Sequence, residues 1–138
     1  MPIKTPIFIS CLFILLGLMG CNTAPTPTPA PLEPGDPDRG AALFAQPVIG
    51  TSNAVGCITC HSLQENITLV GPSIAGIASR AGETVPGQTA EEYLRLAIVE
   101  PNAYMVPGYQ SGSMYLDYGR ELSPQQIEDL IAYMLTLE

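Results

Sequence analysis

Residues 57–61 read Cys-Ile-Thr-Cys-His, and this run constrains the fold more than any other feature of the chain. It holds two of the four cysteines and the only histidine among 138 residues. A disulfide-stapled fold needs more cysteines at wider spacings. A structural zinc site needs four ligands, and the only cysteines outside this run are Cys11, in the apolar N-terminal segment, and Cys21, for which a lipid is predicted below. A dithiol redox motif belongs in a βαβ setting, which the rest of the sequence does not predict.

The spacing Cys-x-x-Cys-His is that of covalent haem attachment. Two cysteines on one helical turn can each form a thioether with a haem vinyl group, and the histidine that follows at once lies under the iron. We therefore predict one covalent haem c, bound by Cys57 and Cys60, with His61 as its proximal ligand.

The second axial ligand cannot be another histidine of the same chain, because there is none. Methionine is the expected ligand, and we expect it on a loop, since a methionine on the apolar face of a helix usually packs in the core. Met134 is therefore assigned to packing. Met114 lies in the small-residue stretch 111–115, whose chain can approach a haem closely, and is the predicted ligand. Met105, just before Val-Pro-Gly, is the alternative.

The first twenty residues predict export. Lys4 is followed by an almost wholly apolar run from Ile7 to Met19, which is too short to span a hydrocarbon core of about 30 Å but suits a signal peptide. The residues Leu-Met-Gly before Cys21 resemble a lipobox, so we predict a lipoprotein signal over 1–20 and a lipid on Cys21. An ordinary secretory signal and an uncleaved anchor are the alternatives. Lipidation would hold the protein on the extracytoplasmic face of a bacterial membrane.

Residues 21–35 form a predicted tether. Five prolines fall between residues 22 and 35, a composition that favours extended polyproline II over packing. At about 3.1 Å per residue, this stretch would reach roughly 40 Å from the membrane.

The domain predicted over 36–138 is all-helical. Asp36 and Pro37 are a helix start, and Pro47 ends that helix. Capping boxes at 89–92 and 123–126 open two more helices, one running to about Val99 and one at the C-terminus. No stretch has the period of a strand, and the rest is loop with a short apolar piece at 74–78. Loops this long in about 100 residues imply that a bound group fills the middle.

The charge balance limits the partners. Without the signal peptide, four arginines face 13 acidic residues. Nucleic acid and anionic head groups would be repelled, whereas a basic docking face, or an apolar patch around the cofactor, would suit a partner.

These features together resemble the class I (mitochondrial-type) c-type cytochromes over residues 36–138, and among them the membrane-tethered monohaem lipoproteins. In that family a glycine and an aromatic of the first helix pack against a leucine and an aromatic of the last. Gly40 and Phe44 match the first pair, and Leu130 and Tyr133 match the second. The resemblance implies the class I cytochrome c fold, all-α, with short helices and long loops around one haem c.

The resemblance also implies roles around the haem. The Gly71-Pro72 step matches the turn whose proline carbonyl accepts the proximal histidine's Nδ1–H, so Pro72 would orient His61. The stretch from Pro101 to Met114 resembles the loop that delivers the axial methionine. The ligand is often followed by proline in the family, and Tyr115 stands there instead, which keeps Met105 as the alternative.

Five further residues are candidates for the haem surroundings. Arg80 could pair with a haem propionate, or be a solvated surface arginine. Four tyrosines of the methionine loop could line the pocket or pack half-exposed at the surface: Tyr104, Tyr109, Tyr115 and Tyr118.

The expected function is one-electron transfer at the membrane surface, not enzyme catalysis. The protein would relay electrons between respiratory or photosynthetic complexes, such as a quinol oxidoreductase, a terminal oxidase or a photosynthetic reaction centre, either as a shuttle or as a fixed subunit. The alternative is a haem enzyme or gas-binding sensor with an open distal position, which requires that neither Met114 nor Met105 binds the iron.

Overall fold

The computed structural model describes residues 31–138. The predicted signal peptide, the predicted lipidation site Cys21 and the predicted tether up to residue 30 lie outside the described residues. Within 31–138, no helix has the length and apolar character needed to cross a bilayer.

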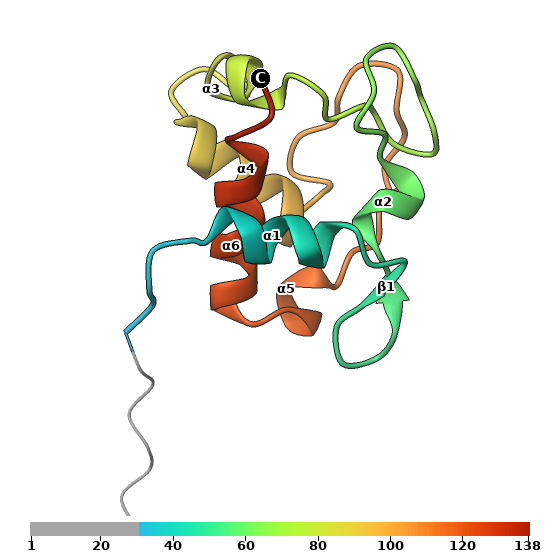
Figure 1. Cartoon of the computed structure of the whole chain (residues 1–138). Helices are drawn as coiled ribbons and strands as arrows, with labels where there is room; N and C mark the ends of the chain where they lie inside the picture. The colour runs from blue at the N-terminus through green and yellow to red at the C-terminus, as the bar shows by residue number, and fades with distance from the viewer. Residues whose placement is uncertain (1–30) are drawn as a thin grey trace, which may run out of the picture. The chain divides into compact units, whose positions relative to one another are not determined.

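Short helices and one small hairpin make up the described domain (Figure 1). The elements in chain order are α1 (Pro37–Phe44), β1 (Val48–Ile49), β2 (Ala54–Val55), α2 (Cys57–Cys60), α3 (Ile77–Thr84), α4 (Ala90–Val99), α5 (Tyr118–Glu121) and α6 (Pro124–Met134). Figure 1 shows α1 crossing α6 at the centre, with α2 and the hairpin to one side and α3 and α4 to the other.

The crossing of α1 and α6 is the scaffold of the domain. The Asp36 side chain caps α1 by accepting from the amides of Asp38 and Arg39 at 2.9 and 3.0 Å, as the sequence predicts. A side chain at Gly40 would overlap the backbone of Asp129 on α6, so the helices can meet this closely only at a glycine. Phe44 then stacks at a tilt on Tyr133, with ring centroids 5.6 Å apart.

A buried carboxylate locks this crossing. Asp129 is only 4% exposed, and it accepts from Arg39 Nε at 2.8 Å and Nη2 at 2.9 Å. The Arg39 guanidinium, helped by the Asp36 amide and the Gln125 side chain, lowers the pKa of Asp129 to about 2. Glu33 also exchanges two hydrogen bonds with Gln125, so the chain is attached to α6 three residues ahead of Asp36.

The two predicted capping boxes are confirmed. Thr89 and Glu92 cap α4 reciprocally, and Ser123 and Gln126 do the same for α6. The last helix buries one apolar face, namely Ile127, Leu130, Ile131 and Met134.

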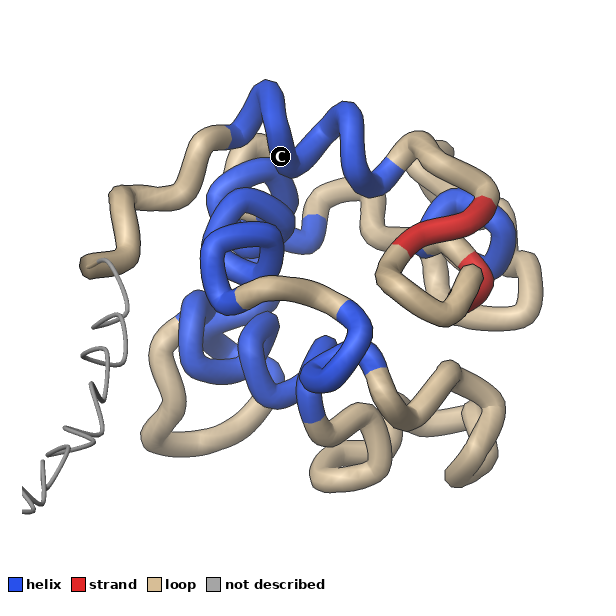
Figure 2. The backbone as a smooth tube through the Cα atoms, turned by 90° about the horizontal axis from the view of Figure 1, so that it is seen from below, coloured by secondary structure: helices blue, strands red, loops and turns tan. Residues whose placement is uncertain are grey.

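Three elements differ from the sequence expectation. Val48 and Ile49 pair antiparallel with Val55 and Ala54, in a hairpin beside α2 (Figure 2). Strands of two residues are too short to show an alternating pattern, so the expectation of no strand was wrong. Helix α5 lies inside the stretch predicted as loop, and α3 spans residues 77–84 where only a short apolar piece at 74–78 was expected. Neither helix has a side-chain N-cap, the signal that marked the other starts.

Candidate haem-binding site

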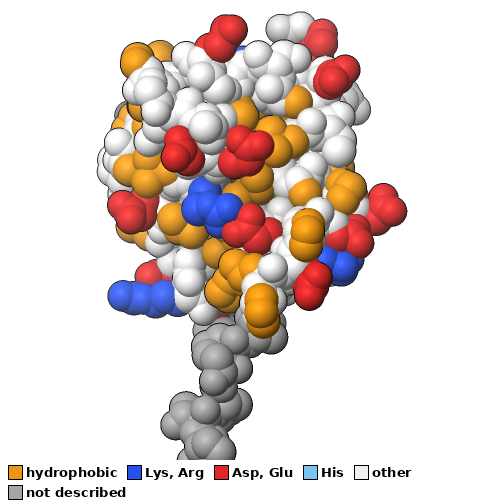
Figure 3. All heavy atoms as spheres, turned by 90° about the vertical axis from the view of Figure 1, so that its left-hand side faces the viewer, with side chains coloured by type: hydrophobic (Ala, Val, Ile, Leu, Met, Phe, Trp, Pro, Cys, Tyr) orange, Lys and Arg blue, Asp and Glu red, His pale blue; other side chains and the backbone are white. Residues whose placement is uncertain are grey.

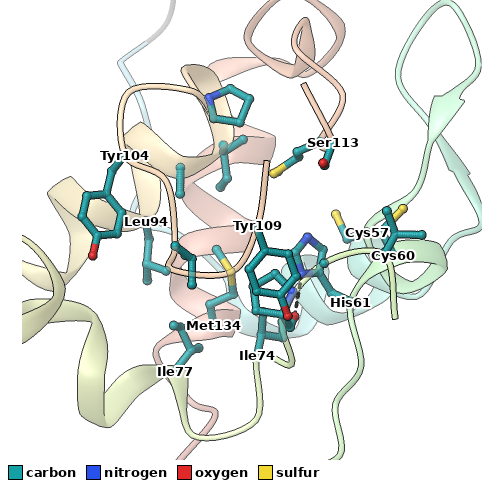
Figure 4. A pocket seen from close by; sticks show the side chains of 18 of the residues that line it. Cys57, Cys60, His61, Ile74, Ile77, Leu94, Tyr104, Tyr109, Ser113 and Met134 are labelled. Carbon is teal, nitrogen blue, oxygen red and sulfur yellow. Dashed lines mark hydrogen bonds between the residues drawn. The ribbon is translucent and has the colours of Figure 1, made fainter. Parts of the chain in front are cut away.

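A cavity of about 460 Å³ lies within the domain, between α2, α3, α4, α6 and the loop 101–115. Its volume falls in the range of about 300–1,000 Å³ typical of cofactor sites. Aliphatic and aromatic side chains supply most of the wall. In Figure 4 the residues of the Cys-x-x-Cys-His run lie together on one side of this cavity, with Ile77, Leu94 and Met134 on the other.

Helix α2 presents both cysteines to the cavity. Its N-cap is Gly56, whose amide donates to the Pro47 carbonyl at 2.8 Å, and a side chain at Gly56 would overlap the Gln46 carbonyl. Both thiols are free and both cysteines are half-buried. Burial raises the pKa of the Cys57 thiol to about 11, which marks the apolar character of its surroundings.

The imidazole of His61 is fixed by a backbone carbonyl. Its Nδ1 lies 2.8 Å from the Pro72 oxygen, the contact that the family resemblance implies. A carbonyl can only accept, so Nδ1 carries the hydrogen and Nε2 keeps its lone pair. Burial lowers the pKa of His61, and the hydrogen bond to Pro72 only partly opposes this. The ring is therefore neutral at neutral pH, the form that can bind a metal through Nε2.

The turn that carries Pro72 depends on Gly71. A Cβ on this residue would lie 2.5 Å from His61 Cε1, so the backbone passes directly against the imidazole edge. The Gly71 amide donates to the Cys60 carbonyl at 2.8 Å, and the Ile74 amide donates to the Ser62 carbonyl at 3.0 Å. Segment 71–74 is thus hydrogen-bonded to the end of α2 and to Ser62, and it packs against the His61 ring on the Nδ1 side.

Three methionines line the cavity: Met105, Met114 and Met134. Met134 is 8% exposed and belongs to the packed face of α6, in agreement with its assignment to the core. Met105 and Met114 are both half-buried loop residues. Of these two, Met114 is the one that packs against the hydrophobic core.

All four tyrosines singled out in the sequence line the cavity. Tyr118 is 4% exposed, and its hydroxyl donates to the Val55 carbonyl at 2.6 Å. Tyr115 lies edge-on to Tyr118, with ring centroids 5.0 Å apart. Tyr104 makes a similar contact at 6.0 Å with Tyr93 of α4. Tyr93 was not predicted as a site residue, although its place on the apolar face of the predicted helix 90–99 could have suggested it.

Arg80, in the middle of α3, also lines the cavity. Its guanidinium donates to the backbone carbonyls of Ala75 and Ser73. Arg39, Arg95 and Arg120 each pair with a carboxylate, whereas within residues 31–138 Arg80 pairs with none. Its pairing with a propionate stays a prediction.

These residues fit a covalent haem. Two free thiols stand one helical turn apart beside a neutral imidazole whose Nδ1 is bound to the Pro72 carbonyl, so that Nε2 is the nitrogen left to bind a metal, and an apolar cavity adjoins them. Elsewhere in the described chain, no three His, Cys, Asp or Glu side chains are grouped so as to hold a metal ion.

Comparison with known proteins points the same way. Residues 37–138 match the sequence profile of the family described as cytochrome c. A cytochrome c2 of Rhodopseudomonas palustris is 25% identical over 126 residues, which cover 75% of this chain and 99% of that protein.

Replacing Gly71 with alanine tests the placement of the histidine. The added methyl group of Gly71→Ala would clash with the His61 ring. We therefore expect this variant to lower the free energy of unfolding of the haem-loaded protein by about 1–3 kcal/mol. Guanidinium denaturation followed by haem absorption measures this. The matched control is Gly82→Ala in α3, where a Cβ has ordinary contacts at 3.6 Å and should leave stability equal or higher. Equal behaviour of the two variants would contradict the placement.

Proposed function

The chain belongs to the cytochrome c family, and from this premise we propose that it carries single electrons at a membrane surface, with His61 and Met114 as axial ligands of its haem. Family membership makes it an electron-transfer protein with one covalent haem c. The observation that carries the ligand proposal is the position of a neutral, oriented imidazole on one wall of an apolar cavity whose wall also includes a loop methionine.

The protein's own residues prepare the site. Haem supplies an iron that takes up and releases one electron. Cys57 and Cys60 hold the group covalently, and the Pro72 carbonyl keeps His61 in the orientation and tautomer that present Nε2. The apolar wall excludes water, and a thioether ligand is neutral and soft, so both favour the reduced, less charged state.

Met114 is favoured over Met105 by its packing. Met114 packs against the core, and the residue that follows it, Tyr115, contacts the buried Tyr118 edge-on. An open-site haem enzyme or sensor would require both methionines to stay away from the iron, although both line the cavity.

Substitution of each methionine distinguishes Met114 ligation, Met105 ligation and an open distal position. Ferric haem with a methionine ligand has a weak far-red absorption band. We expect Met114→Ala to abolish this band and to make the reduced protein bind carbon monoxide quickly, because a coordination position opens. Met105→Ala is the matched control and should keep the band. A band that survives Met114→Ala but not Met105→Ala would overturn the ligand proposal, and a wild-type protein without the band would favour the open site.

The charge distribution supports a particular docking face. Residues 101–116, which form one side of the cavity wall, contain no charged residue, and residues 57–73 contain only Glu65. The other 12 acidic residues and all four arginines lie outside these segments. Figure 3 shows the face of the domain that carries α4 and α6 and points away from α2. Acidic and arginine side chains are interspersed with hydrophobic ones there.

Exposed apolar side chains gather in the same two segments, 57–73 and 101–116. Of the seven large hydrophobic residues that are exposed in the described chain, five belong to them: Leu63, Ile67, Leu69, Val70 and Leu116. We propose that a membrane redox complex, such as a quinol oxidoreductase, terminal oxidase or photosynthetic reaction centre, docks here through an uncharged apolar surface. The acidic surroundings suit a basic rim on that partner.

A charge placed in this face should slow electron transfer. Leu69 and Val48 are both 48% exposed, but only Leu69 lies within segments 57–73 and 101–116. We expect Leu69→Glu to lower the rate at which membranes of the source organism reoxidise the reduced protein by about fivefold or more, because docking would bury the new carboxylate. Val48→Glu should change this rate less than about twofold. Equal rates for the two variants would contradict the docking face.

Location at the extracytoplasmic face of a bacterial membrane is proposed from the N-terminal sequence. The lipobox-like residues before Cys21 and the proline-rich stretch after it suit a lipid-anchored tether. A single tethered domain would then stay close to membrane complexes, which raises its effective concentration near them.

Removing the lipidation site tests this location. Cys21→Ser should appear in the soluble extracytoplasmic fraction, whereas the wild-type protein should need detergent for release. Fractionation followed by haem staining after denaturation measures both, since a thioether-bound haem stays attached. A Cys21→Ser protein that stays with the membranes would contradict the lipid anchor.

A further inference from the structure

We propose that Glu121 is a positioning residue for Met114 and acts through the hydroxyl of Tyr115. The proposal rests on the His61–Met114 ligation proposed above. None of the haem-binding roles proposed above involves this carboxylate.

One oxygen of Glu121 holds the hairpin that leads into α2. Glu121 Oε2 accepts from the Ser52 amide at 2.8 Å, the Thr51 amide at 2.9 Å and the Thr51 hydroxyl at 3.0 Å. The turn is shaped for this contact, because Gly50 has φ +77° and a Cβ there would lie 2.7 Å from the Cβ of Glu121. The amide of Ser52, followed by the other donors of the turn, lowers the pKa of Glu121. The carboxylate therefore stays ionised at neutral pH.

The other oxygen of Glu121 holds the methionine loop. Glu121 Oε1 accepts from the Tyr115 hydroxyl at 3.3 Å, and Tyr115 is the residue directly after Met114. The Tyr115 ring lies edge-on to Tyr118, whose own hydroxyl donates to the Val55 carbonyl. Glu121 of α5 therefore joins two segments far apart in the sequence, the one that leads to Cys57 and the one that carries Met114.

The methionine is restrained on its other side as well. The amide of Gly112 donates to Asn102 Oδ1 at 2.9 Å, which closes the base of the loop two residues before Met114. Gly112 has φ +79°, a conformation that favours glycine. With one contact before the methionine and one after it, the loop has little freedom to withdraw the thioether from the iron. Loss of the Tyr115 contact should make the methionine easier to displace.

The test uses the haem-loaded ferric protein and imidazole, which competes with the methionine for the iron. Tyr115→Phe removes one hydroxyl and keeps the ring, while Glu121→Gln keeps an oxygen for the hairpin. We expect each variant to bind imidazole about three- to tenfold more tightly than the wild-type protein, because one hydrogen bond that favours the bound methionine is weakened or lost. Arg120→Gln, which breaks an exposed pair with Asp117, the residue before α5, is the matched control and should change the affinity less than twofold.

The double variant separates positioning from general destabilisation. If Tyr115 and Glu121 act as one unit, Tyr115→Phe should add less than about twofold in the Glu121→Gln background. Independent, multiplying effects would overturn the proposal, as would a Tyr115→Phe affinity within twofold of wild type. Those results, obtained while Met114→Ala still abolishes the far-red band, would reject the positioning role alone. Survival of the band in Met114→Ala would reject the ligand proposal and this one with it.

Discussion

The imidazole of His61 is held between a carbonyl at its back and a cavity at its front, and the rest of the domain is arranged around that constraint. The Pro72 oxygen sets the tautomer, Gly71 lets the chain pass against the ring edge, and the Cys60 carbonyl ties that turn to α2. Burial keeps the ring neutral. The orientation of this single histidine is fixed by backbone carbonyls and not by other side chains.

The domain separates its charges from its redox site. The ion pairs of Arg39 with Asp129 and of Arg95 with Glu128 fasten α1 and α4 to α6. The segments 57–73 and 101–116 contribute to the cavity wall with one charge between them. Most charged side chains therefore lie outside the segments that line the cavity. The apolar neighbourhood of the cavity suits the docking face proposed above.

Local sequence signals predicted the parts of this structure that local interactions determine. The Cys-x-x-Cys-His run, the Asp36 cap and the two capping boxes depend on residues within four positions of one another. The hairpin and α5 escaped prediction because each stabilises the other across about 70 residues, through Glu121 with Thr51 and Ser52. Asp129 likewise reads as one more solvated acid until Arg39, 90 residues away, is placed beside it. The site's cysteines and histidine could be found from the motif and Pro72 from the family resemblance, whereas Glu121 and Asp129 are brought next to their partners only by the fold.

Ligation of the haem iron by both His61 and Met114, as proposed above, can be observed by proton NMR of the reduced protein with methyl-labelled methionine, because the haem ring current shifts the methyl of a bound methionine far upfield. We expect one such resonance, absent in Met114→Leu and retained in Met105→Leu. A spectrum with no upfield methyl, or one that loses it only in Met105→Leu, would exclude Met114 as the ligand.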